Sequence, residues 1–135
     1  MSQLEATIED IKTIESLTML TLTIKEKSLT MVSLELDSKI EVGKRVTLVC
    51  KPTSIALAKV GIDQNDISYS NQLEVEVLQL EKGNILSTLL LSFKGSILES
   101  IVTTKSIENM DLKKGSIVLA LIKAHELSIG KILND

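Results

Sequence analysis

The sequence predicts an all-β protein made of two small Greek-key barrels, and three observations support this prediction. The chain has 135 residues, which suits one domain or two very small ones. Its apolar residues fall in strand-length runs that are bounded by turn residues. Similar runs recur at an almost constant spacing, which indicates an internal repeat.

The repeat is visible in two pairs of aligned segments. Gln, Leu and Glu recur in register between SQLEATI (2–8) and NQLEVEV (71–77), at an offset of 69 residues. Residues 40–59 align with residues 112–131 at an offset of 72, which matches Gly43 with Gly115, Val46 with Val118, Lys51 with Lys123 and Lys59 with Lys131. The segment between the repeats is dense in Gly, Asp, Asn and Ser, as linkers are. We therefore predict a first unit at 1–60, a linker at 61–70, and a second unit at 71–135 with an opening segment from Ser68.

The expected strands follow from runs rich in Val, Ile, Thr and Leu. In the first unit these runs span 18–24, 28–36 and 45–50. In the second unit they span 73–80, 85–93, 96–102 and 116–122. The turns EKGN and FKGS place Gly where a hairpin can use a positive φ. Four or five short strands in each unit favour a small barrel.

A short helical turn is expected in the second unit, after the run at 96–102. Thr103 or Thr104 can cap a helix that starts near Lys105, and Ser106 lies in its first turn. The first unit shows no clear helix at the matching place. The helical turn is therefore a feature that distinguishes the two units.

The run at 117–122 is apolar on both faces, which is typical of a strand buried on both sides. One face can line the barrel interior, and the other can meet a neighbouring unit. A unit of about 60 residues buries only about 60% of its unfolded surface, so we expect the units and several chains to pack together. Lys123 ends this run at the rim of that contact.

Charge and composition argue against nucleic-acid binding. The net charge is −3, with lysines and acids interspersed, whereas binding to nucleic acid depends on neutralising phosphates. Tyr69 and Phe93 are the aromatic residues of the chain, so a surface for stacking bases is not expected.

No apolar stretch approaches the roughly 20 residues of a membrane span, and the N-terminal residues lack the pattern of a secretion signal. A single cysteine, Cys50, excludes a disulfide framework and a cysteine-rich metal site. We expect a cytoplasmic protein that does not enter the membrane.

Hydroxyl groups and a cation mark the candidate site. Thr103, Thr104 and Ser106 gather at a helix start, where unpaired backbone N–H groups favour anions. Lys123, at the end of a buried strand, needs an anion or a set of acceptors if it is drawn out of water. These groups suit a tetrahedral oxyanion. The alternative is that the hydroxyls only cap the helix and that Lys123 only extends to water.

The strings VTTKS (102–106) and LKKGSIVLALIKAHEL (112–127) resemble the C-terminal half of the Mop or TOBE family, and SYSNQLEVEV (68–77) resembles its opening segment. This resemblance implies tandem OB-like barrels that bind molybdate or tungstate at contacts between units, with no other cofactor. The positions that match the ligand contacts of the family are Thr103, Ser106, Lys123, Ser68 and Asn71. Thr104, beside the cap, and Lys51, the counterpart of Lys123 in the first unit, complete the candidate oxyanion-binding set.

Some positions depart from the family pattern. Ser70 stands where the family usually has an arginine, which removes a cation from the expected pocket, and Val75 stands where a glycine is common. In the first unit, CKPT (50–53) replaces IKAH, and Thr30 and Ser33 fall inside a strand-like run. The first unit is therefore the more degenerate copy.

Catalysis and a metal site are not expected. His125 has Glu126 beside it on the opposite face of an extended chain, so the two form no metal pair. Cys50 lies in an apolar run and fits a core position, and no nucleophile has a histidine partner. We therefore expect a binding protein and not an enzyme.

Three functions fit the pattern. The first is intracellular storage, buffering or sensing of molybdate or tungstate by a homo-oligomer, with a trimer favoured and a dimer second. The second is a regulatory module of the TOBE type that acts with a separate transport ATPase or transcription regulator. The third is a structural assembly whose anion sites have decayed. The two oxyanions have the same shape and charge, so the sequence does not choose between them.

Overall fold

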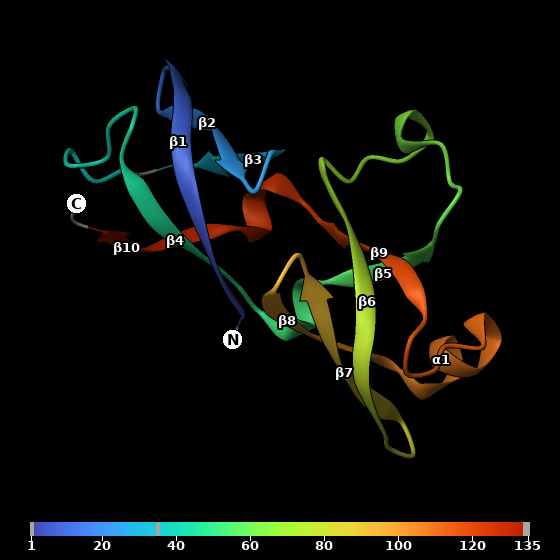
Figure 1. The fold of residues 1–135 in the computed structure, drawn as a ribbon. Helices are drawn as coiled ribbons and strands as arrows, with labels where there is room; N and C mark the ends of the chain where they lie inside the picture. The colour runs from blue at the N-terminus through green and yellow to red at the C-terminus, as the bar shows by residue number, and fades with distance from the viewer. Residues whose placement is uncertain (1, 35, 134–135) are drawn as a thin grey trace.

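The computed structural model describes residues 2–34 and 36–133, and this part of the chain folds into two five-stranded antiparallel sheets (Figure 1). The first sheet contains β1 (Ser2–Ile14), β2 (Leu17–Ile24), β3 (Lys27–Ser33), β4 (Arg45–Cys50) and β10 (Ser128–Leu133). The second contains β5 (Ala56–Lys59), β6 (Asn71–Lys82), β7 (Leu86–Phe93), β8 (Ser96–Thr103) and β9 (Ile117–Ile122). The helical elements are η1 (Pro52–Ser54), η2 (Gln64–Asp66), α1 (Thr104–Met110) and η3 (Ala124–Glu126). The predicted all-β fold class with a short helical turn is confirmed.

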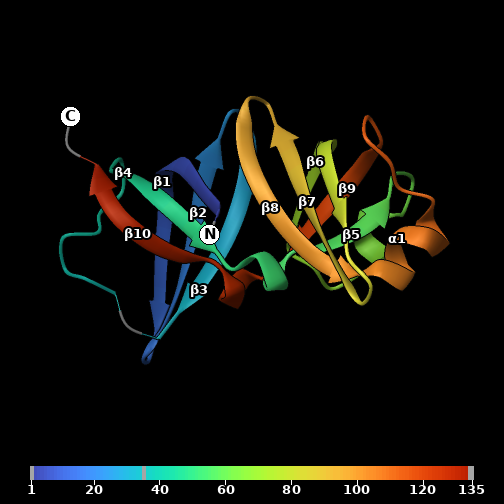
Figure 2. The same cartoon turned by 90° about the horizontal axis from the view of Figure 1, so that it is seen from below.

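The two sheets have the same strand order, and each takes one edge strand from the other half of the sequence. The order is β10-β4-β1-β2-β3 in the first sheet and β5-β9-β6-β7-β8 in the second. Strand β5 thus follows β4 in the chain but pairs with β9, while β10 follows β9 but pairs with β4 (Figure 2). The division into units 1–60 and 71–135 stays a prediction from the sequence repeat. The two sheets do not follow this division strictly, because each contains one strand from the other unit.

Alternating burial explains why the central strands form. In β2, Thr18, Leu20, Leu22 and Ile24 are buried, and in β7 every second residue from Ser87 to Phe93 is buried. This period of two places one face of each strand toward the interior. A single cluster of buried apolar side chains includes residues from both sheets. The two halves therefore share one core.

The β2–β3 and β7–β8 turns meet each other. The Lys25 ammonium donates to the carbonyl of Lys94, and the Lys94 ammonium donates to the carbonyl of Lys25 at 2.8 Å. These two lysines are 69 residues apart, which is the offset of the sequence repeat. Both adopt a positive φ, of 46° and 47°, as the tight turns require. Matched positions of the repeat thus touch across a local twofold arrangement.

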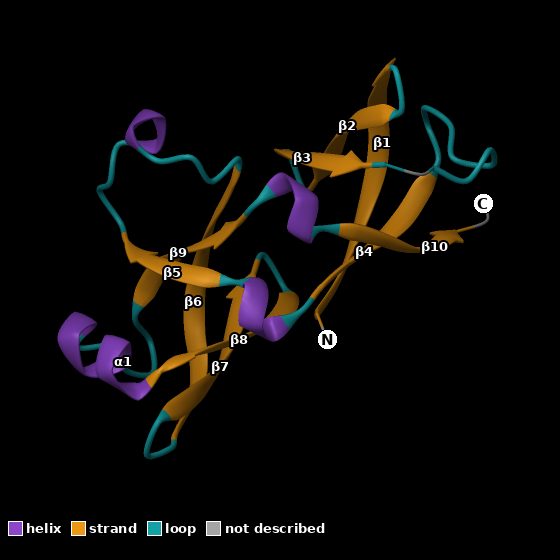
Figure 3. Ribbon diagram, turned by 180° about the vertical axis from the view of Figure 1, so that it is seen from behind, coloured by secondary structure: helices purple, strands orange, loops and turns teal. Residues whose placement is uncertain are grey.

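A second matched pair lies at the short helices η1 and η3, which are adjacent between the two sheets (Figure 3). The Ser54 hydroxyl donates to Oε2 of Glu126 at 2.9 Å, across 72 residues of sequence. This separation is the second offset of the repeat. The local twofold relation therefore also holds at the ends of β4 and β9.

The connections between the third and fourth strands differ between the halves. Strand β8 leads directly into α1, whereas the described residues after β3, which are 34 and 36–44, form bends and turns without a helix. The prediction of a short helix after the third strand of the second half, with none at the matching place in the first half, is confirmed for the described residues. No helix in the described part of the chain is long and apolar enough to cross a membrane.

Candidate functional site

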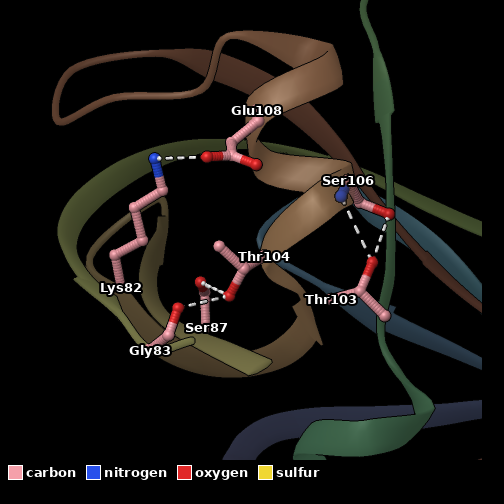
Figure 4. Close-up of polar contacts among 7 residues, drawn as sticks. All are labelled: Lys82, Gly83, Ser87, Thr103, Thr104, Ser106 and Glu108. Atoms are coloured by element: carbon pink, nitrogen blue, oxygen red, sulfur yellow. Dashed lines mark hydrogen bonds and ion pairs between the residues drawn. The ribbon is translucent and has the colours of Figure 1, made fainter. Parts of the chain in front are cut away.

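Thr103, one of the two threonines predicted as a possible cap, caps the start of α1. Its backbone is extended, at φ −67° and ψ 145°, and its Oγ1 accepts a hydrogen bond from the Ser106 N–H at 3.2 Å. The two hydroxyl oxygens lie 2.8 Å apart (Figure 4). A threonine with this backbone pairs one of the unpaired N–H groups of the first helical turn. The cap therefore fixes both hydroxyls on the outer side of the helix start.

Thr104 points into the protein. Its Oγ1 donates to the Gly83 carbonyl at 2.7 Å and lies 2.8 Å from the Ser87 hydroxyl (Figure 4). The side chain is buried, at 7% exposure. On the surface beside it, Lys82 and Glu108 form an ion pair at 3.3 Å. Thr104 thus packs α1 onto the β6–β7 turn, and its hydroxyl group is occupied by these contacts.

Thr103, Ser106 and Lys123 line one open hollow of about 430 Å³. The first two belong to the cap and first turn of α1, and Lys123 follows β9 as the N-cap of η3. The Tyr69 ring, from the end of the linker, lies 5.8 Å from the Lys123 ammonium and contributes a cation–π contact. Three of the predicted ligand-binding residues are therefore brought together.

Two opposite charges face this hollow. Lys123 supplies the cation, and within residues 2–34 and 36–133 its ammonium forms no ion pair. Glu126 supplies a carboxylate, whose Oε2 accepts the hydrogen bond from Ser54 and whose Oε1 lies 3.6 Å from Nε2 of His125. A ligand in the hollow thus meets one cation, one carboxylate and the hydroxyl groups.

Ser68 and Lys51 border other hollows. Ser68 is exposed on the linker and lines a shallow polar hollow of about 380 Å³ with Gln64 and Ser70. Tyr69 borders this hollow as well as that of Lys123. Lys51 is exposed and lines a hollow of about 300 Å³ that also includes Glu126. These two candidates are therefore neighbours of the Lys123 hollow and do not line it.

Asn71 is completely buried, and its side chain joins the two sheets. Its Oδ1 accepts from the Thr30 N–H at 2.8 Å, and its Nδ2 donates to the Thr30 carbonyl at 2.9 Å. The amide thus completes a pair of hydrogen bonds between the start of β6 and the edge strand β3. Such a buried amide costs free energy unless it is paired, so this contact fixes Asn71 in place.

Sequence reasoning missed the other residues that line the hollow, among them the polar side chains of Thr53, Ser54, Tyr69 and Glu126. The repeat offers a signal for two of them, because Ser54 and Glu126 occupy matched positions and matched positions meet at a local twofold relation. The linker position of Tyr69 gives no comparable signal.

Cys50 is an unreactive core residue, as expected. Burial raises the pKa of its thiol to about 11, and the Glu126 carboxylate adds to the effect. The thiol therefore stays protonated at neutral pH, when only a thiolate would be nucleophilic. No cluster of three or more His, Cys, Asp or Glu residues suited to a metal occurs among the described residues.

A comparison with protein families finds a match for the second half of the chain. Residues 67–129 match the model of the TOBE domain. This segment is a TOBE domain. It runs from the end of the linker through α1 and β9 into β10, and it contains the capped helix start and Lys123. The predicted family is confirmed.

Two solved structures are similar to this TOBE-containing chain. One is the cytoplasmic molybdate-binding protein ModG with molybdate bound, at 24% identity, a TM-score of 0.85, and coverage of 95% of this chain and 94% of that chain. The other is a molybdate-binding protein from Sporomusa ovata, at 35% identity and a TM-score of 0.47, which covers 48% of this chain and 97% of that chain. The ModG match confirms the predicted tandem OB-like fold. The comparison with curated protein sequences gave no match.

Proposed function

We propose that this protein binds molybdate or tungstate, and that the hollow lined by Thr103, Ser106 and Lys123 is its binding site. The observation that carries this proposal is the meeting, at one place, of two hydroxyl groups from the start of α1 and an ammonium group from the end of β9, which forms no ion pair within the described residues. The TOBE assignment and the ModG fold support it.

The groups in the hollow match the chemistry of a tetrahedral oxyanion. Such an anion is an acceptor at each oxygen, and an ammonium group supplies three donors. The hydroxyls of Thr103 and Ser106 add neutral donors, which rotate to suit the ligand. Lys123 is the cation among the residues that line the hollow, so it is the principal cation of the proposed site. Hydrogen bonds to a charged group contribute about 1.5–3 kcal/mol each. Molybdate and tungstate share shape and charge, and we propose both as ligands.

The remaining candidates have supporting positions. Thr104 and Asn71 hold α1 and β6 in place through their buried hydrogen bonds. Ser68 and Lys51 line adjacent hollows. We propose that Ser68 and Lys51 contribute to the site when a neighbouring copy of the chain covers it.

The openness of the hollow supports assembly. Its volume of about 430 Å³ exceeds what one oxyanion fills, and it faces solvent. A neighbouring copy of the chain can close it and exclude water, which strengthens the electrostatic contacts of the bound anion. We propose a homo-oligomer, with a trimer favoured and a dimer second.

The proposed role is storage, buffering or sensing of the oxyanion, with no reaction and no other cofactor. The buried, protonated thiol of Cys50 is consistent with a binding role. ModG is described as cytoplasmic, and we propose the same compartment for this protein.

Titration calorimetry with molybdate tests the proposal. Wild-type protein is expected to bind, and Lys123→Met is expected to bind roughly tenfold to a hundredfold more weakly, which corresponds to about 1.4–2.7 kcal/mol. Lys114→Met is a matched control, because Lys114 is exposed and lies outside this hollow. Wild-type protein that binds neither anion at millimolar concentration, or equal losses in the two variants, would contradict the proposed site.

A further inference from the structure

Glu126 is an unexpected group in a hollow proposed to take anions. Its carboxylate lines the hollow with Lys123, Thr103 and Ser106, and its side chain is 40% exposed. An ionised carboxylate is an acceptor only. It therefore repels any anion through charge, and it offsets this repulsion with a hydrogen bond only where the anion brings a hydroxyl donor.

The position of this carboxylate is fixed by contacts on both sides. Oε2 accepts from the Ser54 hydroxyl at 2.9 Å, and Oε1 lies 3.6 Å from His125. The backbone N–H of Glu126 donates to the Lys123 carbonyl at 3.0 Å, which ties it to the residue that supplies the cation. The Lys123 ammonium and the Glu126 carboxylate thus border the same hollow without pairing with each other, and both can contact a ligand there.

We propose that Glu126 determines which tetrahedral oxyanions the hollow selects. This inference rests on the proposed oxyanion-binding function and concerns the same site. At neutral pH molybdate, tungstate and sulfate carry no proton, whereas phosphate and arsenate carry at least one hydroxyl. Glu126 weakens binding of the first group through charge repulsion. It accepts a hydrogen bond from the second group, and a charge-assisted bond of this kind is among the stronger ones in proteins.

The net charge of the hollow supports the same conclusion. One cation and one carboxylate cancel, so that a fully deprotonated dianion gains little from the overall charge. Its binding then depends on Lys123 and the hydroxyl donors alone. Removing the carboxylate leaves the cation unopposed within the hollow, and the effect on a dianion is larger than on a neutral ligand.

The test uses the full chain and three anions, which are molybdate, sulfate and phosphate, titrated separately into wild-type protein and Glu126→Gln. Glutamine keeps the shape of the side chain, and its amide oxygen still accepts from Ser54. Molybdate affinity is expected to rise roughly tenfold, because one repelling charge at short range is removed. Phosphate affinity is expected to fall. The ratio of molybdate affinity to phosphate affinity should therefore change by more than tenfold.

Glu108→Gln is the matched control, since Glu108 is an exposed carboxylate on α1 that pairs with Lys82 and does not line the hollow. Equal shifts in both variants would indicate a general charge effect and overturn the inference. Unchanged affinity ratios in Glu126→Gln, with molybdate bound by the wild type, would overturn it while leaving the proposed function in place. If neither protein binds any of the three anions, both proposals are wrong.

Discussion

The connection from β8 to β9 and the connection from β3 to β4 join equivalent strands of the two sheets, but their residues differ in chemistry. In both halves the third strand is reached through a turn of the same register, with Lys27 opposite Ile24 and Ser96 opposite Phe93. Continuing this offset of 69 residues places Leu34 where Thr103 lies and Asp37 where Ser106 lies. The second half thus has a hydroxyl-bearing helix start, while the first half has an apolar residue and an acid.

This difference shows that the fold and the candidate site depend on different residues. Both halves build the same strand order, with or without the helix. In the first half, Asp37 Oδ1 accepts from the Lys39 N–H at 2.8 Å and closes a local turn, and the backbone needs no helix cap there. The hydroxyl groups at the start of α1 in the second half are therefore not needed for the strand order that both halves share.

The largest expected effect concerns the shared framework. Leu20 and Leu89 occupy matched positions in β2 and β7, and both are fully buried. Leu20→Ala and Leu89→Ala should each lower the free energy of unfolding by about 2–5 kcal/mol, since each leaves a cavity in a packed core. Chemical denaturation measures both. Leu86→Ala, at a position 54% exposed, is the control and should cost much less. A large loss in only one of the two core variants would break the comparison.

The next effect concerns the two matched lysines. Lys123→Met should weaken molybdate binding roughly tenfold to a hundredfold, because it removes the cation of the proposed site. Lys51→Met should change the affinity by less, about threefold at most, since Lys51 lies in an adjacent hollow and contributes only when a second surface covers the site. Titration calorimetry compares the two variants. A larger loss for Lys51→Met would move the working site to the first half.

Neighbouring threonines should separate binding from stability. Thr104→Val leaves the Gly83 carbonyl without its buried donor, so the free energy of unfolding should fall by about 1–3 kcal/mol. Thr103→Val removes the helix cap at a cost of about 1 kcal/mol and also removes a hydroxyl from the hollow. Thermal melting and molybdate titration, measured on both variants, should show reduced affinity mainly in Thr103→Val. Reduced affinity in Thr104→Val alone would contradict the inward role of that side chain.

The smallest effect is expected in the first half. Asp37→Ser restores the residue type found at the matched position of the second half, and a serine hydroxyl can also accept from the Lys39 N–H. The free energy of unfolding should change by less than about 0.5 kcal/mol, as for most surface positions, and no new molybdate site should appear. Binding of a second molybdate per chain to this variant would show that one residue is enough to complete the site.

Much of the fold could be predicted, because strands with one buried face carry a local signal. The runs in β2 and β7 alternate as the sheet requires, and a cap at Thr103 or Thr104 follows from residue type and position, with the structure placing it at Thr103. The exchange of β5 and β10 could not be predicted, since ALAK and SIGKIL would suit an edge of either sheet. Which sheet accepts them depends on the path of the chain after η1 and η3.

The candidate site was predicted in part for a similar reason. Thr103, Ser106 and Lys123 come together because each lies at the end of a regular element, where direction is well defined. The inward turn of Thr104 and the pairing of Asn71 with Thr30 depend on contacts between distant segments. Residue type and spacing along the chain carry no information about those contacts.

The exchanged edge strand β10 has a consequence for how the protein folds during synthesis. Strand β4 pairs with β1 on one side and with β10 on the other, so the ribosome completes the first four strands of the first sheet long before it makes the fifth. Until residue 133 has emerged, β4 exposes unpaired N–H and C=O groups along one edge. Such an open edge can pair with another chain, and partly made chains with unpaired edges are prone to aggregate. The nascent first half is thus a stage at which the edge of β4 that later accepts β10 stays open to pairing with another chain.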